Sequence, residues 1–448
     1  MTFEDLHFIY PTFDDVETYT AIHFVPPNAE NVRVVRCAFV NCPVAVEIEN
    51  CLQGSIMQCT FQYTSGGNVG VAVILGNTSG DAAKQIYVAG CLFFADAGPP
   101  GSTAMIIYGA EHIKVADCRM DSFLYGIRII PGPGHNAVRC TFTSIAIFAN
   151  TTDYNVVGTA VQIQPQDDDT QIAQIVFTGC SFELSETATP ASPGGPGIIV
   201  DANGSIVDNV RFVSCYSTRW PGPGLVIEGG ASNVEVLGGF YAGNNYETAT
   251  DEAYGIYIGY ATGVRIVGAS CIGEYQWVTI GGVTTTYQQA VGIYVDQGAQ
   301  DVLIDGCDVT GNSTDGIVVD ASEGSVTAIY IRNCNVTGYS AYGTAIAVSG
   351  PEASLTTVQI TNCAGYNDQS ALLASSAPGN GTPFYNRTYS YYGPATFYVG
   401  AGTATISYIN VGGHNTQLKT GAFALAPGQS GTVAWSLMGT PTFVMIGE

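Results

Sequence analysis

The segment IYVAGCLF (residues 86–93) recurs along the chain, and its recurrence decides the fold. The motif begins with a short strand of alternating apolar residues. A small or polar residue comes next, then a Cys, and then two residues that start another strand, as in VRVVRCAF (32–39) and IVFTGCSF (175–182). The positions that align with Cys91 are Cys37, Cys59, Cys118, Cys140, Cys180, Cys215, Gly239, Ala269, Cys307, Cys334 and Cys363. Such internal self-similarity is typical of solenoid proteins, in which each repeat packs on its neighbours.

A second motif, a small residue followed by apolar-x-apolar, alternates with the first, as in GIIVD (197–201) and GIYVD (292–296). Each period, roughly 22–40 residues long, holds two or three short strands rich in Val, Ile and Tyr. No helical period is sustained. We therefore predict an all-β chain whose residues 1–365 form a right-handed parallel β-helix.

The cysteines of the first motif are expected to stack about 4.8 Å apart, one strand spacing, as small buried side chains. We expect free thiols, as in a protein made in a reducing cytoplasm. There is no CxxC motif and the five histidines are scattered, so no metal and no cofactor are predicted. The acidic run 167–169 offers oxygen ligands for Ca²⁺, but a solvated turn is the favoured interpretation.

The repeat pattern ends near residue 365. Residues 366–394 are polar and rich in Gly, Pro and Ser, which predicts a linker. Residues 395–448 show alternating strands at hairpin spacing, which predicts a small β-sandwich-like antiparallel C-terminal domain. We expect that domain to cover one open end of the solenoid, and a partner protein or further domain to cover the N-terminal end.

Composition excludes several classes of function. The chain has 37 acidic and 13 basic residues, for a formal charge of −24, so nucleic acid and anionic lipid are not expected partners. No apolar run of about 18 residues is present, so membrane insertion is not predicted. The N-terminal residues MTFEDLHFIYPTFDD lack a basic region followed by an apolar stretch, so no signal peptide is expected.

The coil motif with its Cys-x-apolar step, followed by FALAPGQSGTVAWSLMGTPTFVMIG (423–447), resembles bacteriophage tailspikes of the pectin-lyase-like β-helix type. The resemblance implies a homotrimer in the virion, attached by its N-terminal end to a phage tail or adaptor protein. It implies synthesis in the host cytoplasm and binding of a bacterial surface polysaccharide outside the host cell. Because the first coil motif begins at the start of the sequence, we do not expect within it the particle-anchoring N-terminal domain of intact tailspikes. A non-enzymatic adhesin and a free polysaccharide hydrolase or lyase remain alternatives, because the same fold serves all three.

Carboxylates gather where the second motif ends. Alignment of the motifs gives an outward column of Glu49, Ile74, Tyr108, Ile130, Gln164, Asp201, Glu228, Gly259, Asp296, Asp320 and Ser349. Glu228 and Asp296 flank Gly259 about 9–10 Å apart, which suits the acid and base of an inverting glycosidase. Adjacent Asp296 and Asp320 would suit a retaining pair. The alternative is that these acids cap turns.

Other groups complete the predicted site. Tyr257 and Tyr294 lie in the neighbouring outward column, and Asp201, Asp320 and Glu274 are substitutes for the catalytic pair. Two long connections are expected to bring further groups to the rim, or else to form a trimer interface: Tyr246, Glu247, Asp251, Tyr275 and Trp277. Arg128 is the only basic residue placed on this strand motif and is expected far from the acids. This favours a neutral glycan and hydrolysis over elimination.

Overall fold

The protein is described here by a computed structural model. It describes residues 1–10, 19–24, 30–63, 70–77, 82–95, 102–149, 158–184, 195–244, 254–280, 283–337, 345–350 and 355–366, and seven strands between 384 and 447. For residues 274–288 and from 384 onward it describes the backbone only. These parts contain strands and no helix, which confirms the all-β prediction. They accordingly contain no helix long and apolar enough to cross a membrane.

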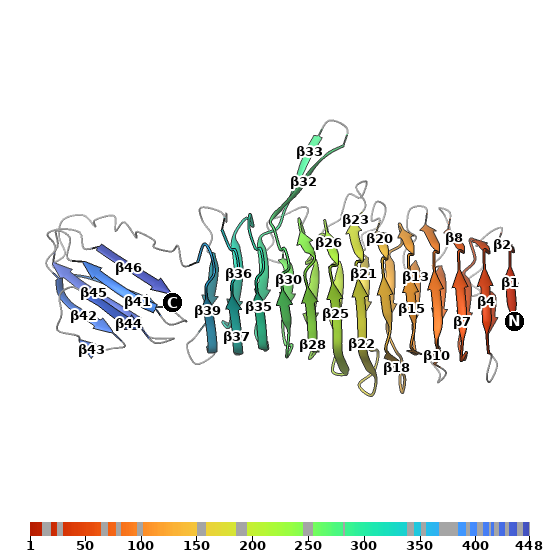
Figure 1. Ribbon diagram of the computed structural model, residues 1–448, viewed down its shortest axis with the longest axis horizontal. Coiled ribbons are helices and arrows are strands. Elements are labelled where there is room, and N and C mark those ends of the chain that lie inside the picture. Colours follow the sequence, from red (N-terminus) through yellow and green to blue (C-terminus); the bar gives the residue numbers. More distant parts are fainter. Residues whose placement is uncertain are drawn as a thin grey trace.

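Three long parallel sheets wind around a common axis and form an elongated β-helix (Figure 1). Sheet A contains, in order, β1 (Thr2–Glu4), β4 (Val32–Val35), β7 (Gly54–Met57), β11 (Ile86–Ala89), β15 (Lys114–Ala116), β19 (Thr141–Thr143), β22 (Gln171–Thr178), β25 (Ile206–Val213), β28 (Ser232–Leu237), β31 (Arg265–Val267), β35 (Gln300–Asp305), β37 (Val326–Arg332) and β39 (Leu355–Thr361). The short strands β10 (Ala83–Lys84), β14 (Ala110–Glu111) and β18 (Asn136–Val138) extend it.

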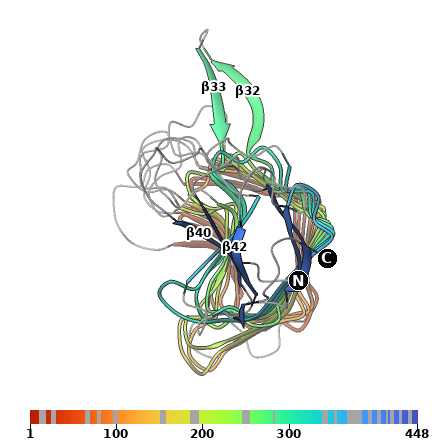
Figure 2. The same ribbon diagram turned by 90° about the vertical axis from the view of Figure 1, so that its left-hand side faces the viewer.

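Sheet B follows sheet A in each of the first nine coils. Its strands are β2 (His7–Ile9), β5 (Ala38–Val40), β8 (Thr60–Tyr63), β12 (Leu92–Ala95), β16 (Arg119–Asp121), β20 (Ala146–Ala149), β23 (Ser181–Leu184), β26 (Tyr216–Thr218) and β29 (Phe240–Ala242). Sheet C contains β3 (Thr20–Phe24), β6 (Val44–Ile48), β9 (Val71–Leu75), β13 (Thr103–Ile107), β17 (Tyr125–Ile129), β21 (Thr159–Ile163), β24 (Ile198–Asp201), β27 (Leu225–Glu228), β30 (Tyr254–Ile258), β34 (Val291–Val295), β36 (Asp315–Asp320) and β38 (Ile346–Ser349). Viewed end-on, the sheets surround a common axis (Figure 2). The buried side chains between them form one continuous core.

Single residues with left-handed backbone bend the chain from sheet A into sheet B. Gly179 has a φ of 59°, and Ser214, its equivalent in the next coil, has a φ of 51°. Gly adopts this conformation without steric cost, and Asn, Asp and Ser tolerate it with side chains that bond locally. This bend is called a left-handed corner below. It explains why a Gly or short polar residue so often precedes the Cys of the repeat.

The core is built from stacks of equivalent side chains. Phe39, Phe61 and Phe93 stack with ring centroids 5.0 and 4.7 Å apart. The cysteine column runs beside them, and all thirteen cysteines are free and buried. Since β19 pairs with β15 of sheet A, the predicted place of Cys140 in that column is wrong. Ile145 holds it instead, because the Ala146 N–H donates to the Cys118 carbonyl and the Ser181 N–H, one coil further on, donates to the Ile145 carbonyl.

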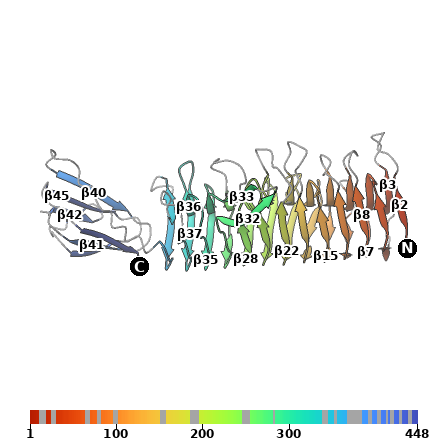
Figure 3. The same cartoon turned by 90° about the horizontal axis from the view of Figure 1, so that it is seen from above.

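The strands near the C-terminus pair antiparallel. β40 (Phe384–Ser390), β45 (Ser430–Ser436), β42 (Ile406–Val411) and β43 (His414–Asn415) form one sheet, and β44 (Gly421–Leu425), β41 (Ala395–Gly400) and β46 (Thr442–Gly447) form another. They lie beyond β39 at the end of the solenoid (Figures 1 and 3). β40 begins inside the segment predicted as a linker. The domain limits at 365 and 394 stay predictions, since residues 367–383 and 391–394 are outside the described residues.

Candidate functional site

Two outward columns of side chains run along sheet C. Pairing of Val226 with Tyr257, and of Tyr257 with Tyr294, defines the first column. Pairing of Asp201 with Glu228 and of Asp320 with Ser349 places the acids in the second, at the strand ends. One predicted member was wrong: Ile74 pairs with Glu47 and so belongs to the first column. The motif alignment was displaced by two residues there, which preserves the face but changes the column.

Three tyrosines form a platform on this face. Tyr254 and Tyr294 stack with centroids 4.6 Å apart, and Tyr257 lies 5.7 Å from Tyr254 and 6.0 Å from Tyr294. Tyr254 was missed in the sequence. Strict alternation puts it on the same side as inward-facing Ile256, whereas its ring joins the outer cluster. The intervening Gly255 is the only signal of that break, because glycine often marks an irregularity in a strand.

A groove of about 440 Å³ lies over the platform. Its walls combine apolar side chains with the predicted acid and base, Glu228 and Asp296. The other lining residues are Pro196, Ile199, Pro223, Val226, Tyr254, Tyr257 and Tyr294. Apolar and aromatic walls with a few convergent polar groups are typical of ligand sites. Asp201 and Asp320, the predicted substitutes, are not among the lining residues.

Asp201 and Asp320 both cap turns. The backbone N–H of Asn203 donates to Asp201 Oδ1 over 2.8 Å, and that of Ser322 donates to Asp320 Oδ1 over 2.9 Å. Partial burial opposes ionisation of Asp320, but bonds from Ser322, Tyr294 and Ser349 outweigh it and lower its pKa. Hydrogen bonds of this kind stabilise the carboxylate. Both side chains therefore have a structural role, as the turn-capping alternative anticipated.

Asp296 is held by a neighbouring tyrosine. The Tyr257 hydroxyl donates to Asp296 Oδ2 over 2.6 Å, and the Gln297 N–H donates to Oδ1 over 2.7 Å. A Cβ on Gly259 would lie 2.7 Å from the Tyr257 hydroxyl oxygen, so only glycine leaves room for this ring. The position between the two acids is thus partly filled by Tyr257, where the sequence suggested an open gap. Burial and the bond to Asp296 raise the pKa of Tyr257, so it remains a donor.

Glu228 differs from the other acids of the column. Burial raises its pKa, and the negative charge of Asp201 on the adjacent strand raises it further. Among the described residues, no side-chain or backbone group donates a hydrogen bond to its carboxylate. A half-buried carboxyl group with a raised pKa keeps its proton to a higher pH than an exposed one, which is the direction of shift that a general acid requires.

A buried ladder of amides supports the groove from inside. Asn244 Nδ2 donates to Gln289 Oε1 over 3.3 Å, and Gln289 Nε2 donates to Asn312 Oδ1 over 2.9 Å. A Cβ on Gly255 would lie 2.8 Å from Gln289 Nε2, so the small residue that opens the strand motif leaves room for this ladder. The ladder restrains the chain behind the platform, because satisfied buried polar networks are rigid.

Arg128 does not contact the acids directly, but two glutamine side chains connect it to Asp201. Its Nε donates to Gln162 Oε1 over 2.8 Å, and Gln162 Nε2 donates to Gln164 Oε1 over 2.6 Å. Gln164 Nε2 in turn donates to Asp201 Oδ2 over 2.6 Å. The chain of bonds crosses β17, β21 and β24, so polar groups continue along sheet C from the groove toward the N-terminal end.

Several predicted rim residues cannot be placed. Tyr246, Glu247 and Asp251 lie outside the described residues. The backbone of Glu274, Tyr275 and Trp277 lies on β32 (Glu274–Ile280), which pairs antiparallel with β33 (Val283–Gln288). This hairpin projects from the body of the solenoid (Figures 1 and 2). The roles of all six side chains stay predictions.

The model of the family described as the right handed beta helix region matches residues 159–363 and 268–389. The two matches together span residues 159–389, 231 of the 448 residues. The chain belongs to this family. No curated protein sequence matches the chain.

Three solved structures are similar to parts or most of this chain. The tailspike protein of E. coli bacteriophage HK620, solved in complex with a pentasaccharide, is 11% identical, with a TM-score of 0.43 over 99% of this chain and 79% of that one. The A-module of the mannuronan C-5 epimerase AlgE4 of Azotobacter vinelandii is 12% identical, with a TM-score of 0.39 over 75% and 87%. The periplasmic alginate epimerase AlgG is 11% identical, with a TM-score of 0.37 over 73% and 77%. At these identities the similarity concerns the fold.

Proposed function

We propose that this β-helix is a phage tailspike that binds a bacterial cell-surface polysaccharide along sheet C and hydrolyses it in the groove. The observation that carries the proposal is the convergence of a tyrosine platform, the raised pKa of Glu228 and the oriented carboxylate of Asp296 in one groove. Sugar rings place their apolar faces on aromatic side chains, and carboxylates accept bonds from hydroxyls. The resemblance of the repeat to tailspikes supports a homotrimer bound to a tail protein in the virion.

Hydrolysis with inversion assigns one role to each acid. Protonated Glu228 donates its proton to the glycosidic oxygen as the bond from that oxygen to the anomeric carbon breaks. A water molecule attacks the anomeric carbon from the other face and gives a proton to Asp296. Each oxygen of Asp296 accepts one described hydrogen bond and keeps a second lone pair for that proton. The two strand spacings between the acids, about 9–10 Å at Cα, suit this mechanism.

The assignment is tested with purified polysaccharide from candidate hosts and an assay of new reducing ends. We expect cleavage by the wild type and a loss of about 10²–10⁴-fold in Glu228→Gln and Asp296→Asn, with glycan binding retained. Glu235→Gln on β28 of sheet A is the matched control and should cleave normally. Unchanged cleavage in both groove variants would show that the assignment is wrong.

A non-enzymatic adhesin is the second candidate. It is favoured by the turn-capping bonds of Asp201, Asp296 and Asp320, which give each acid a structural purpose. The same assay separates the two functions, because an adhesin binds the glycan through the tyrosine platform but releases no reducing ends. Binding without cleavage by the wild type would establish the adhesin.

A further inference from the structure

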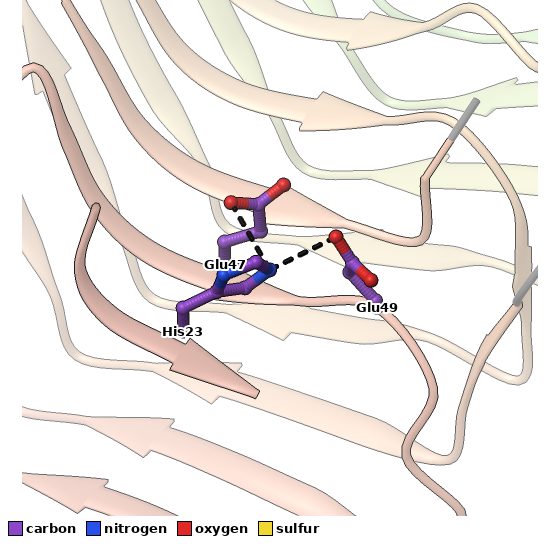
Figure 4. Close-up of side chains that lie close together, drawn as sticks. All are labelled: His23, Glu47 and Glu49. Atoms are coloured by element: carbon purple, nitrogen blue, oxygen red, sulfur yellow. Dashed lines mark hydrogen bonds and ion pairs between the residues drawn. The ribbon is translucent and has the colours of Figure 1, made fainter. Parts of the chain in front are cut away.

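A histidine and two glutamates converge on the outer face of sheet C, far from the groove. His23 Nε2 on β3 lies 2.9 Å from Glu49 Oε1 and 3.5 Å from Glu47 Oε2 (Figure 4). The three ligand atoms all lie within 4.8 Å of one another. Six strand spacings separate β6 from β27 in sheet C, about 29 Å, so this cluster is independent of the proposed catalytic pair.

We propose that His23, Glu47 and Glu49 form a binding site for a first-row divalent cation, with Zn²⁺ the preferred ion. Donor atoms about 2.0–2.1 Å from a tetrahedral Zn²⁺ lie about 3.3 Å apart, close to the 2.9 and 3.5 Å observed. One imidazole and two carboxylates suit this ion, whereas Ca²⁺ takes oxygen ligands only. Three protein ligands leave a fourth position for water.

The backbone holds the ligands in place without a metal. Glu47 is paired with His23 in the parallel register of β3 and β6, and Glu49 follows two residues later on the same outward face. The Thr20 hydroxyl donates to Glu47 Oε2 over 3.1 Å and so orients that carboxylate. Partners that orient ligands in this way commonly strengthen metal sites.

Charge favours a cation at the same place. Glu47 and Glu49 are 18% and 15% exposed at their side chains, so two carboxylates share a half-buried position. Among the described residues, no Lys or Arg pairs with either of them. The next coil presents Ile74 and Gly76 there, neither of which carries charge. A divalent ion would neutralise both carboxylates and tie β3 to β6.

The site is tested on the full chain with ZnCl₂ by calorimetry and with CoCl₂ by visible absorption. We expect one Zn²⁺ per chain, a rise in melting temperature with Zn²⁺, and a Co²⁺ spectrum without an intense thiolate charge-transfer band. His23→Ala and Glu49→Gln should weaken binding by at least about 10–100-fold. His7→Ala, which removes an exposed histidine on β2, is the matched control and should bind as the wild type does.

Three results would overturn the proposal. One is the absence of saturable Zn²⁺ binding by the wild type. Another is equal affinity in the wild type and His23→Ala, which would place the ion elsewhere. The third is Ca²⁺ binding as tight as Zn²⁺ binding and insensitive to His23→Ala, which would indicate a simple pair of carboxylates. Glycan cleavage is not a readout in any of these measurements, so failure of this site leaves the proposed hydrolysis untouched.

Discussion

At the scale of single residues, Glu228 differs from its aspartate neighbours in the groups that its carboxylate contacts. Asp201, Asp296 and Asp320 each accept a backbone N–H from the turn that follows, and at Asp320 such bonds lower the pKa. Glutamate is one methylene longer, and Glu228 lies in the groove beside the tyrosines instead of bonding its turn. Burial and the nearby charge of Asp201 therefore raise the pKa of Glu228, whereas the bonds at Asp320 lower the pKa there.

The raised pKa of Glu228 makes stability depend on pH in a defined direction. Between the ordinary glutamate value of 4.5 and the raised pKa of the folded state, the folded chain holds a proton that the unfolded chain has released. The contribution of Glu228 to the unfolding free energy is therefore complete below pH 4.5, and it decreases as the pH rises through the pKa of the folded state. We expect the unfolding free energy of the wild type, relative to Glu228→Gln, to decrease over that window in denaturant titrations. A flat or rising difference would contradict the raised pKa, and Glu235→Gln controls for loss of a carboxylate elsewhere.

At the scale of elements, the ends of β30 and β34 act as one unit. Gly259 follows β30 and Asp296 follows β34, and the Tyr257 ring fills the space over Gly259 to reach Asp296. We expect Gly259→Ala to displace that ring and break the bond, and so to reduce both glycan affinity and cleavage. Tyr257→Phe should reproduce the effect, while Tyr87→Phe on β11 of sheet A should not. Wild-type affinity and rate in Gly259→Ala would show that the ring position is unimportant.

The strand motifs predicted the sheets well and the individual columns less well. Period-2 alternation assigned the inward and outward faces, which is why Asp201, Glu228, Asp296 and Asp320 were correctly aligned. A left-handed corner precedes strands at more than one place in a coil, as at Arg139 and Ser144, with φ of 58° and 54°. A Cys after such a corner therefore does not identify which corner it is. Cys140 was misplaced for that reason.

At the scale of the molecule, the solenoid brings together residues about one coil apart in the sequence. His23 and Glu49 are 26 positions apart, and Arg128 and Gln162 are 34 apart, yet each pair is in contact. The coil length varies because the connections vary, so sequence spacing alone did not reveal either contact. The scattered histidines looked unsuited to a metal for the same reason, although one of them lies beside two glutamates.

The same stacking makes the cysteines reporters of global unfolding. All thirteen are buried, and burial raises the pKa of Cys42 to about 11 and of Cys140 to about 12. Aromatic disulfide reagents attack accessible thiolates, and burial denies them access to the thirteen thiols in the folded chain.

We expect no thiol to react with such a reagent in the native protein and thirteen to react after denaturation in guanidinium. Since each coil is packed between its neighbours, the labelling rate should equal the unfolding rate measured by fluorescence under the same conditions. Reducing agent should leave the melting temperature unchanged, because no disulfide contributes to it. Rapid labelling of several thiols, independent of denaturant, would instead show that individual coils open separately from the rest of the solenoid.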